Sequence, residues 1–352
     1  MSRLYLDGTK IGYHLDELNK WLKGEFFPPI HIEIGPTSAC NHKCFFCYVD
    51  YKKENVGYLK KGLYLKLIES CRNIGVKSVL LAGDGDPLVN KNTANAIELA
   101  GRIGLDIALN TNAVLLTPEI SKCILPNLTW MRVSVMSSEP DCYAKLHGTH
   151  PSDFERLVEN LTFAAKYKKE KNLKVTLGVQ QVLIKENANT VAKLAKLTKE
   201  IGFDYYVLKP FHLHPDNAYD TPGDLHEKHK AVLKRAEKLS SENFKSIIRW
   251  NIFEDMGKRH YTRCIGLPFI LQTAGDGHIY TCCPFYGNKE FSYGDLNEQS
   301  LEEILRSSRY RDVQKKVENE IDVNKCMSYC RHHNVNKFLW SFRTPPAHLN
   351  FI

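Results

Sequence analysis

The chain has no long hydrophobic run. No stretch approaches the about 18 uninterrupted apolar residues of a membrane-spanning helix. The amino terminus has no apolar core that could serve as a signal peptide. Low-complexity tracts and internal repeats at solenoid periods are also absent. These absences argue against membrane, secreted and repeat proteins, so we expect a cytoplasmic protein with no membrane partner.

The length and apolar content indicate a large folded protein. The 352 residues exceed the about 100–200 residues of a single typical domain, and 43% of them are hydrophobic, which is enough for a sizeable core. A short peptide-binding module and a disordered chain are therefore excluded. We expect a large barrel, alone or with an appended region.

The charge balance is only mildly basic. The chain has 48 basic and 40 acidic residues, a net charge of +8, which favours phosphorylated or nucleotide-like ligands or an acidic redox partner. The lysines of residues 166–174 follow an amphipathic pattern that is typical of a solvated helix face. Because aromatic residues are not interleaved with a basic stripe, we do not expect nucleic acid as a partner.

Between residue 31 and about residue 210, short β-branched or apolar runs alternate with longer helical patterns. This rhythm forces parallel strand pairing with right-handed crossovers, and its six units predict an α/β fold with an open or partial barrel. Ligands of such sheets bind at the carboxyl ends of the strands. The expected strands are residues 31–35, 77–82, 105–109, 129–135, 174–182 and 204–209.

The alternation stops after residue 215, where a Lys-rich helical stretch leads to a segment with closely grouped cysteines. We therefore expect three regions, an amino-terminal extension (1–30), the partial barrel (31–215) and a small carboxyl-terminal α+β domain (216–352).

Cysteine is the most informative residue type. Eleven cysteines in a reducing compartment are not expected to form disulfides, and their grouping points to metal. The loop after the first expected strand places Cys40, Cys44 and Cys47 at CX3CX2C spacing. Thiolates suit iron–sulfur clusters or zinc, and three ligands leave one iron of a four-iron cluster open. The alternatives are a zinc site completed by His42 or a distant residue, and cysteines that only pack.

This loop resembles the hallmark of the radical S-adenosylmethionine (SAM) superfamily, in which CX3CX2C follows the first strand of a partial (β/α)6 barrel. Phe46 matches the aromatic residue that precedes the third cysteine. The resemblance implies that the three cysteines hold a [4Fe-4S] cluster whose fourth iron chelates SAM. It also implies that SAM is cleaved to a 5′-deoxyadenosyl radical that takes a hydrogen atom from the substrate, with electrons from a low-potential donor such as flavodoxin or ferredoxin.

Further segments at the carboxyl ends of the next strands are similar to family motifs for SAM. The run GDGDP after the second strand resembles the GGEP motif, and the third and fourth strands end in polar residues. Ser134 matches a ribose- or carboxylate-binding serine, although Met136 stands where many relatives have an acid; an inward-facing core serine is the alternative. The residues expected to bind SAM are Gly83, Asp84, Gly85, Asp86, Asn110, Asn112 and Ser134.

A second group of cysteines lies near the carboxyl terminus. Cys264 and Cys282 form a CX12GX4C pattern across an expected GDG hairpin turn, and Cys326 and Cys330 add CX3C, which would share one face if the last helix began there. The pattern resembles the SPASM and twitch extensions of radical SAM enzymes. It implies one auxiliary [4Fe-4S] cluster on these four cysteines, with zinc as the alternative metal. We expect Cys283 to pack rather than to ligate.

The substrate is less sharply indicated. Only about thirty residues precede the first strand, which favours a small molecule over a leader-bearing peptide. A single auxiliary cluster resembles an aminocyclitol dehydrogenase, so we expect oxidation of a secondary alcohol in a sugar, cyclitol or nucleoside. The alternatives are an epimerase or peptide-modifying enzyme on the same scaffold, and a non-enzymatic iron–sulfur or zinc scaffold. Candidates for acid–base catalysis follow the sixth strand: Lys209, His212 and His214.

Overall fold

The computed structural model describes residues 9–49, 57–212, 214 and 216–351. Its centre is one ten-stranded sheet with the strand order β10-β9-β8-β1-β2-β3-β4-β5-β6-β7. The strands are β1 (His31–Ile34), β2 (Ser78–Leu81), β3 (Asp106–Thr111), β4 (Trp130–Ser134), β5 (Thr176–Leu183), β6 (Tyr205–Pro210), β7 (Lys245–Ile248), β8 (Ile270–Thr273), β9 (His278–Tyr280) and β10 (Ser292–Asp295).

Strands β1 to β7 pair in parallel in sequence order, and β8 pairs in parallel with the other side of β1. All six strands expected from the sequence are present, and the mixed α/β fold with a parallel sheet is confirmed. Among the described residues, the edge strands β7 and β10 do not pair with each other. The sheet is therefore compatible with a partial barrel.

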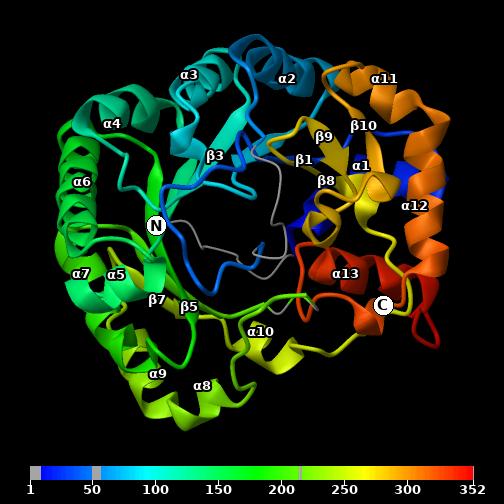
Figure 1. The fold of residues 1–352 in the computed structure, drawn as a ribbon. Helices are drawn as coiled ribbons and strands as arrows, with labels where there is room; N and C mark the ends of the chain where they lie inside the picture. The colour runs from blue at the N-terminus through cyan, green and yellow to red at the C-terminus, as the bar shows by residue number, and fades with distance from the viewer. Residues whose placement is uncertain (1–8, 50–56, 213, 215, 352) are drawn as a thin grey trace.

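The helices form an outer ring around the strands (Figure 1). In the parallel part of the sheet, helices connect one strand to the next and cover its outer face, as expected for right-handed crossovers. The α-helices are α1 (Leu15–Leu22), α2 (Lys61–Ile74), α3 (Thr93–Arg102), α4 (Pro118–Ile124), α5 (Pro140–His147), α6 (Pro151–Glu170), α7 (Val191–Ile201), α8 (Leu225–Lys228), α9 (Lys230–Glu237), α10 (Trp250–Asp255), α11 (Leu301–Arg306), α12 (Ser308–Glu320) and α13 (His333–Arg343).

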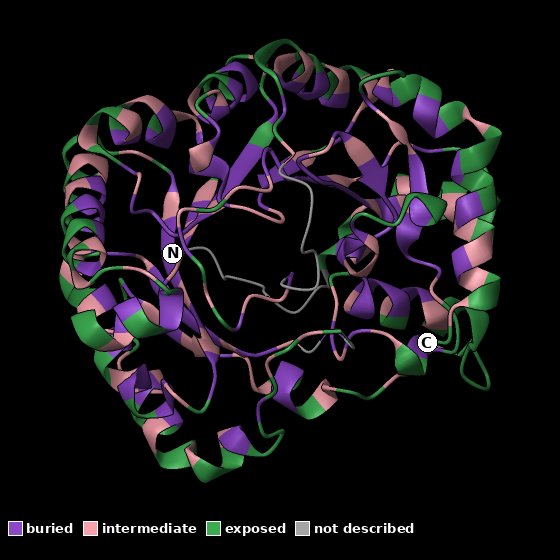
Figure 2. Ribbon diagram, in the orientation of Figure 1, coloured by how far each residue is buried: buried purple, intermediate pink, exposed green. Residues whose placement is uncertain are grey.

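Local sequence accounts for where several helices begin and end. Helices α4, α5 and α6 have proline in the first turn, where its missing N–H costs nothing. Helices α2 and α7 end at Gly75 and Gly202, whose φ angles of 93° and 94° are left-handed. Figure 2 shows the strands mostly buried and the outward helix faces mostly exposed, so the main core lies between the sheet and the helix ring.

The two-residue period of the strands separates this core from the barrel interior. On β1, Ile32 and Ile34 belong to the core, whereas His31 and Glu33 line an internal cavity. Arg132 on β4 and Lys209 on β6 likewise line the cavity. Charged side chains therefore line part of this interior, and the carboxyl ends of β1 to β6 open towards the same space.

The sequence indicates that the alternation of strands and helices stops after residue 215, but in the structure it continues. Strand β7 follows α8 and α9 as a further unit, and β8 extends the same sheet beside β1. The sheet thus continues across the expected boundary, and the division into 1–30, 31–215 and 216–352 stays a prediction. The β8–β9 hairpin is present, with Gly277 at φ 86° in its turn. Cys326 and Cys330 lie in the connection before α13 rather than on a helix.

Candidate active site

The loop that carries Cys40, Cys44 and Cys47 leaves the carboxyl end of β1. The thiol of Cys40 is exposed, and those of Cys44 and Cys47 are half-buried. Backbone hydrogen bonds hold the loop at both ends: Gly35 donates to the carbonyl oxygen of Thr273 at 3.0 Å, and Lys43 donates to that of His147 at 2.9 Å. The three cysteines therefore lie on a loop that is fastened to β8 on one side and to α5 on the other.

The glycine-rich turn after β2 packs directly against this loop. A Cβ atom at Gly85 would lie 2.3 Å from the carbonyl oxygen of Ala39, and one at Gly83 would lie 2.7 Å from the Cα of Gly35. Gly83 also has a φ angle of 141°, which side chains rarely permit. Only glycine at these two positions lets the two loops approach so closely, so the run is more than a generic turn.

The two acidic side chains expected to bind SAM, Asp84 and Asp86, make hydrogen bonds to other parts of the protein. Asp86 is buried and accepts hydrogen bonds from the backbone N–H groups of Leu88 and Asn112 (2.9 and 2.6 Å) and from the Thr111 hydroxyl (3.0 Å). Asp84 accepts a 2.5 Å hydrogen bond from Ser38 of the cysteine loop. These carboxylates hold the loops together.

Asn112 links the third strand to the cysteine loop, because its amide nitrogen donates to Asn41 Oδ1 at 2.7 Å. Asn110 and Ser134 lie on the cavity wall with polar atoms turned inwards, and Asn110 accepts a 3.2 Å hydrogen bond from Arg132. Their role towards SAM stays a prediction, and the half-buried, cavity-lining position of Ser134 differs from that of a sealed core serine.

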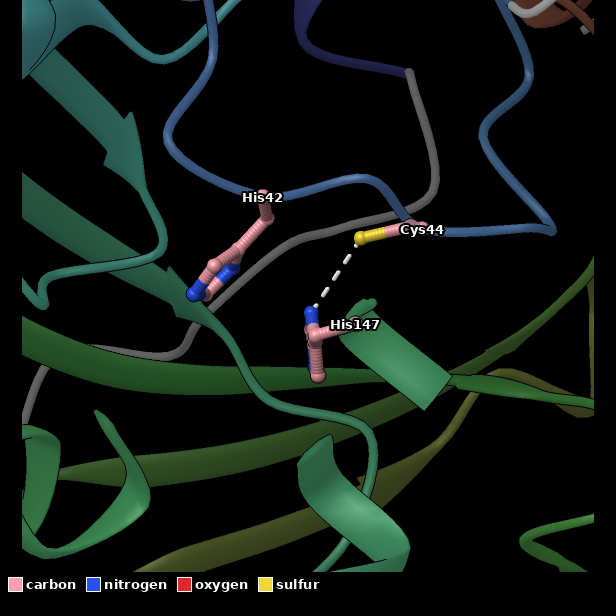
Figure 3. A group of neighbouring side chains, drawn as sticks. All are labelled: His42, Cys44 and His147. Atoms are coloured by element: carbon pink, nitrogen blue, oxygen red, sulfur yellow. Dashed lines mark hydrogen bonds between the residues drawn. The ribbon is translucent and has the colours of Figure 1, made fainter. Parts of the chain in front are cut away.

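One residue that the sequence analysis missed contacts a predicted cluster ligand. Nδ1 of His147, at the end of α5, lies 3.2 Å from Cys44 Sγ (Figure 3). Nε2 of the same ring accepts a 3.3 Å hydrogen bond from the N–H of Met136. The ring hydrogen must then be on Nδ1, so His147 donates to the Cys44 sulfur.

His42 completes a small group with Cys44 and His147 (Figure 3). Their ligand atoms all lie within 4.8 Å of one another, the only such group of three in the part of the chain that is described. Burial lowers the pKa of the His42 ring, and neither of its ring nitrogens makes a hydrogen bond. The group includes only one of the three loop cysteines. Metal analysis of the purified protein would test the alternative that His42 completes a zinc site.

The electrostatics of the loop fit a cationic cofactor. Burial, followed by the negative charge of Asp86, raises the pKa of Cys40 to about 11, and burial together with Cys47 and Cys40 raises that of Cys44 well above its usual value. As metal ligands, cysteines must be thiolates, and iron supplies the positive charge that offsets this repulsion. Three converging thiols on one loop are thus a donor set suited to an iron–sulfur cluster.

The second cysteine group is brought together from three segments. Burial raises the pKa values of Cys264, Cys282, Cys326 and Cys330, and for Cys282 the repulsion comes from all three of the others. Asn336 of α13 donates a 3.3 Å hydrogen bond to the Cys264 sulfur. This grouping of thiols is a donor set suited to a metal cluster, and the assignment of Cys264, Cys282, Cys326 and Cys330 as ligands stays a prediction.

Arg259 braces the loop that carries two of these cysteines. Its guanidinium donates to the carbonyl oxygens of Val323 (3.0 Å), Ser328 (3.1 Å) and Met327. Cys283 takes a different position. It packs in a separate apolar cluster with Tyr280 and Tyr286 and borders the internal cavity, consistent with the expectation that it packs.

The internal cavity has a volume of about 690 Å³ and connects the two cysteine groups. Cys40, Cys44 and Cys47 border it on one side, and Cys283 and Cys330 border it on another. Volumes of roughly 300–1,000 Å³ are typical of small-molecule sites.

The three candidates for acid–base catalysis are separated by the structure. Lys209 and His212 line the cavity. Burial, with repulsion from Arg132, Arg331 and Arg249, lowers the pKa of Lys209 to about 7. His214 lies outside the cavity lining, where its ring contacts the carbonyl oxygen of Pro284 at 3.3 Å and the N–H of Asp216 at 3.1 Å.

A buried ion pair crosses from β1 to the segment after Cys330. Glu33, 2% exposed, accepts hydrogen bonds from both Arg331 and Gln272, at 2.8 and 2.9 Å. Gln272 in turn accepts a 2.5 Å hydrogen bond from the N–H of Cys283. The network fastens both carboxyl-terminal cysteine segments to the barrel, and nothing in the sequence pattern except a charged residue inside an apolar strand signals it.

Comparisons with known proteins agree with this arrangement. The model of the radical SAM superfamily matches residues 34–198, and the model of the SPASM iron–sulfur cluster-binding domain matches residues 269–332. The first match implies a [4Fe-4S] cluster and SAM, and the second implies further iron–sulfur binding.

Two curated relatives span most of the chain. The tungsten-containing aldehyde ferredoxin oxidoreductase cofactor-modifying protein of Pyrococcus furiosus is 22% identical over 302 residues, covering 80% of this chain and 81% of the relative. A probable GTP 3′,8-cyclase of Saccharolobus solfataricus is 25% identical over 294 residues, covering 83% and 85%.

Among solved structures, Streptococcus suis SuiB bound to S-adenosylmethionine has a TM-score of 0.64 at 17% identity, covering 86% of this chain and 71% of SuiB. Native anSMEcpe with bound AdoMet has a TM-score of 0.59 at 18% identity, covering 90% and 98%. These likenesses show the fold. In the described residues, no helix combines the length and apolarity needed to cross a membrane.

Proposed function

The chain belongs to the radical SAM superfamily, and we propose that Cys40, Cys44 and Cys47 hold the SAM-binding cluster of an enzyme that abstracts hydrogen from a small molecule. The observation that carries this proposal is the packing of the cysteine loop against the glycine-rich turn at the mouth of the cavity. When bound, the reduced cluster and SAM supply a 5′-deoxyadenosyl radical as the hydrogen acceptor.

The chain's own residues bind, orient and enclose the reactants. Gly83 and Gly85 bring the backbone of the turn close to the cysteine loop, Asp84 ties the two together through Ser38, and Asp86 ties the turn to the end of β3. Asn110 and Ser134 offer polar atoms on the cavity wall for SAM. In catalysis by a bound cofactor, the protein contributes mainly by positioning the reacting groups. The cysteine loop and the glycine-rich turn, packed against each other, would hold SAM in a fixed position.

We further propose that the substrate is a sugar, cyclitol or nucleoside whose secondary alcohol is oxidised. In this proposal Cys264, Cys282, Cys326 and Cys330 hold an auxiliary [4Fe-4S] cluster, which would serve as electron acceptor. The support is that Cys330 borders the same cavity as the first cysteine loop. His212, which lines the cavity and whose buried Nε2 has no hydrogen-bond partner, is the candidate to take the hydroxyl proton.

The cytoplasm is the location that fits this chemistry. Cysteines that ligate iron must stay reduced, which a reducing compartment allows. A flavodoxin or ferredoxin there would supply the low-potential electrons.

The test uses anaerobically reconstituted protein with dithionite and SAM. The expected result is 5′-deoxyadenosine from wild type and none from the Cys40/Cys44/Cys47 triple alanine variant. Sugars, cyclitols and nucleosides deuterated at a carbinol carbon would then be screened for deuterium in 5′-deoxyadenosine and for a ketone product. Absence of 5′-deoxyadenosine from the loaded wild type would overturn the enzymatic proposal.

The same screen distinguishes the epimerase and peptide-modifying alternatives. A redox-neutral epimerase incorporates solvent deuterium into its product and yields no ketone, and a peptide-modifying enzyme transfers no label from any of the small molecules. Either result would replace alcohol oxidation as the proposed reaction while leaving radical SAM chemistry in place.

A further inference from the structure

Four cationic side chains line the internal cavity together. Arg132 lies on β4, Lys209 on β6, Arg249 directly after β7 and Arg331 after the last cysteine, and all four line the cavity. They are close enough for each of the three arginines to repel the Lys209 ammonium. We call these four residues the cationic wall.

The carboxylates that line the cavity do not neutralise this wall. Glu33 is held by Arg331 and Gln272, so it balances one arginine. Asp86 has its oxygens occupied by Thr111 and by backbone N–H groups. No other Asp or Glu among the described residues lines the cavity.

Among the charged groups that act on the Lys209 ammonium, the three arginines repel it and Glu33 attracts it more weakly. Within the described part of the chain, its ammonium makes no hydrogen bond and no ion pair. The neighbouring His212 also presents a buried Nε2 without a hydrogen-bond partner. A half-buried charge surrounded by like charges is costly to keep unless a ligand compensates it.

We propose that the cationic wall binds a phosphate ester group of the substrate. After the Arg331–Glu33 pair is set aside, Arg132 and Lys209 remain as cations on the cavity wall, Arg132 with the neutral Asn110 as its hydrogen-bond partner, and a phosphate dianion matches their two charges. Guanidinium groups also match phosphate oxygens in paired hydrogen bonds. The inference rests on the proposed function, since it specifies the substrate of the same cavity.

The test is calorimetric titration of the reconstituted, SAM-bound protein with glycerol 3-phosphate, glycerate and glycerol at fixed salt. Wild type is expected to bind the phosphate ester more tightly than glycerate and to show no heat with glycerol. The K209M substitution should weaken glycerol 3-phosphate by about tenfold to a hundredfold, and K209R should restore most of the affinity. K196M removes one exposed charge on α7 and should change nothing.

Several results would overturn the inference: no binding of glycerol 3-phosphate to wild type, equal affinity in the K209M protein, or tighter binding of glycerate. Formation of 5′-deoxyadenosine is measured on the same wild-type preparation. If it forms while the phosphate ester does not bind, the cationic wall has been misread and the radical SAM proposal stands. If the ester binds and no 5′-deoxyadenosine forms, the radical SAM proposal fails instead.

Discussion

The Glu33–Arg331 pair gives a sharp test of how the carboxyl-terminal segment is attached to the barrel. The perturbation is Glu33→Gln, which keeps the side-chain size and removes the charge. Glu33 is only 2% exposed, while the side chain of Arg331 is 36% exposed because it faces the cavity. Losing one partner costs about 3–5 kcal/mol in a fully buried pair and at most about 1 kcal/mol in an exposed one. The intermediate setting predicts a loss of about 2–3 kcal/mol.

The assay is anaerobic thermal unfolding followed by circular dichroism. In a chain of this length the predicted loss lowers the midpoint by roughly 3–4 °C. Glu170→Gln is the matched control, because the Lys166–Glu170 pair is exposed on both sides and should be nearly neutral. The double variant Glu33→Gln with Arg331→Gln should lose less than the sum of the two single changes. An unchanged midpoint in Glu33→Gln, or additivity in the double variant, would refute the reasoning.

Three further predictions follow from the site. Gly85→Ala should abolish iron loading on the first cysteine loop, because its Cβ would collide with backbone, whereas Gly62→Ala on α2, with open space around it, should load normally in an iron and sulfide assay. His147→Phe removes the hydrogen bond to Cys44 and should lower the cluster's midpoint potential in an EPR redox titration by about 60 mV, if the bond favours the reduced state by about 1.4 kcal/mol. Lys209→Met should raise the thermal midpoint of the substrate-free protein most below pH 7, where the ammonium in the folded wild type is charged. The gain should shrink from pH 7 towards 10.5, because the folded wild type has then lost that proton. A gain that grows with pH would contradict this prediction.

Local patterns in the sequence were sufficient for much of the barrel. The β-branched runs predicted β1 to β6, since they alternate with helical patterns, some of which end at a glycine such as Gly75 or Gly202. Strand β7 was not predicted, because its four residues follow a Lys-rich helical stretch and lack a strong flanking signal. The parallel pairing of β8 with β1 could not be seen either, because strand pairing across more than two hundred residues leaves no local periodicity.

In the candidate site, too, local features could be predicted from the sequence and long-range contacts could not. The cysteine spacing and the glycine run are local patterns, so the sequence alone was sufficient to select these two loops as candidates, and the structure places the loops in contact. The contacts of His147 with Cys44 and of Arg331 with Glu33 join residues 103 and 298 positions apart, so only the folded chain reveals them. The sequence did contain one indication that Glu33 has a polar partner: His31 and Glu33 share one face of an otherwise apolar strand, β1.

The central claim is that Cys40, Cys44 and Cys47 hold a cluster with one iron open to SAM. The most direct measurement is the EPR spectrum of the reduced, reconstituted C326A/C330A double variant, in which only the first site should carry iron, recorded with and without SAM. The account predicts about four irons per chain and a spectrum that changes when SAM is added. Zinc in place of iron, or a cluster spectrum that SAM leaves unchanged, would contradict it.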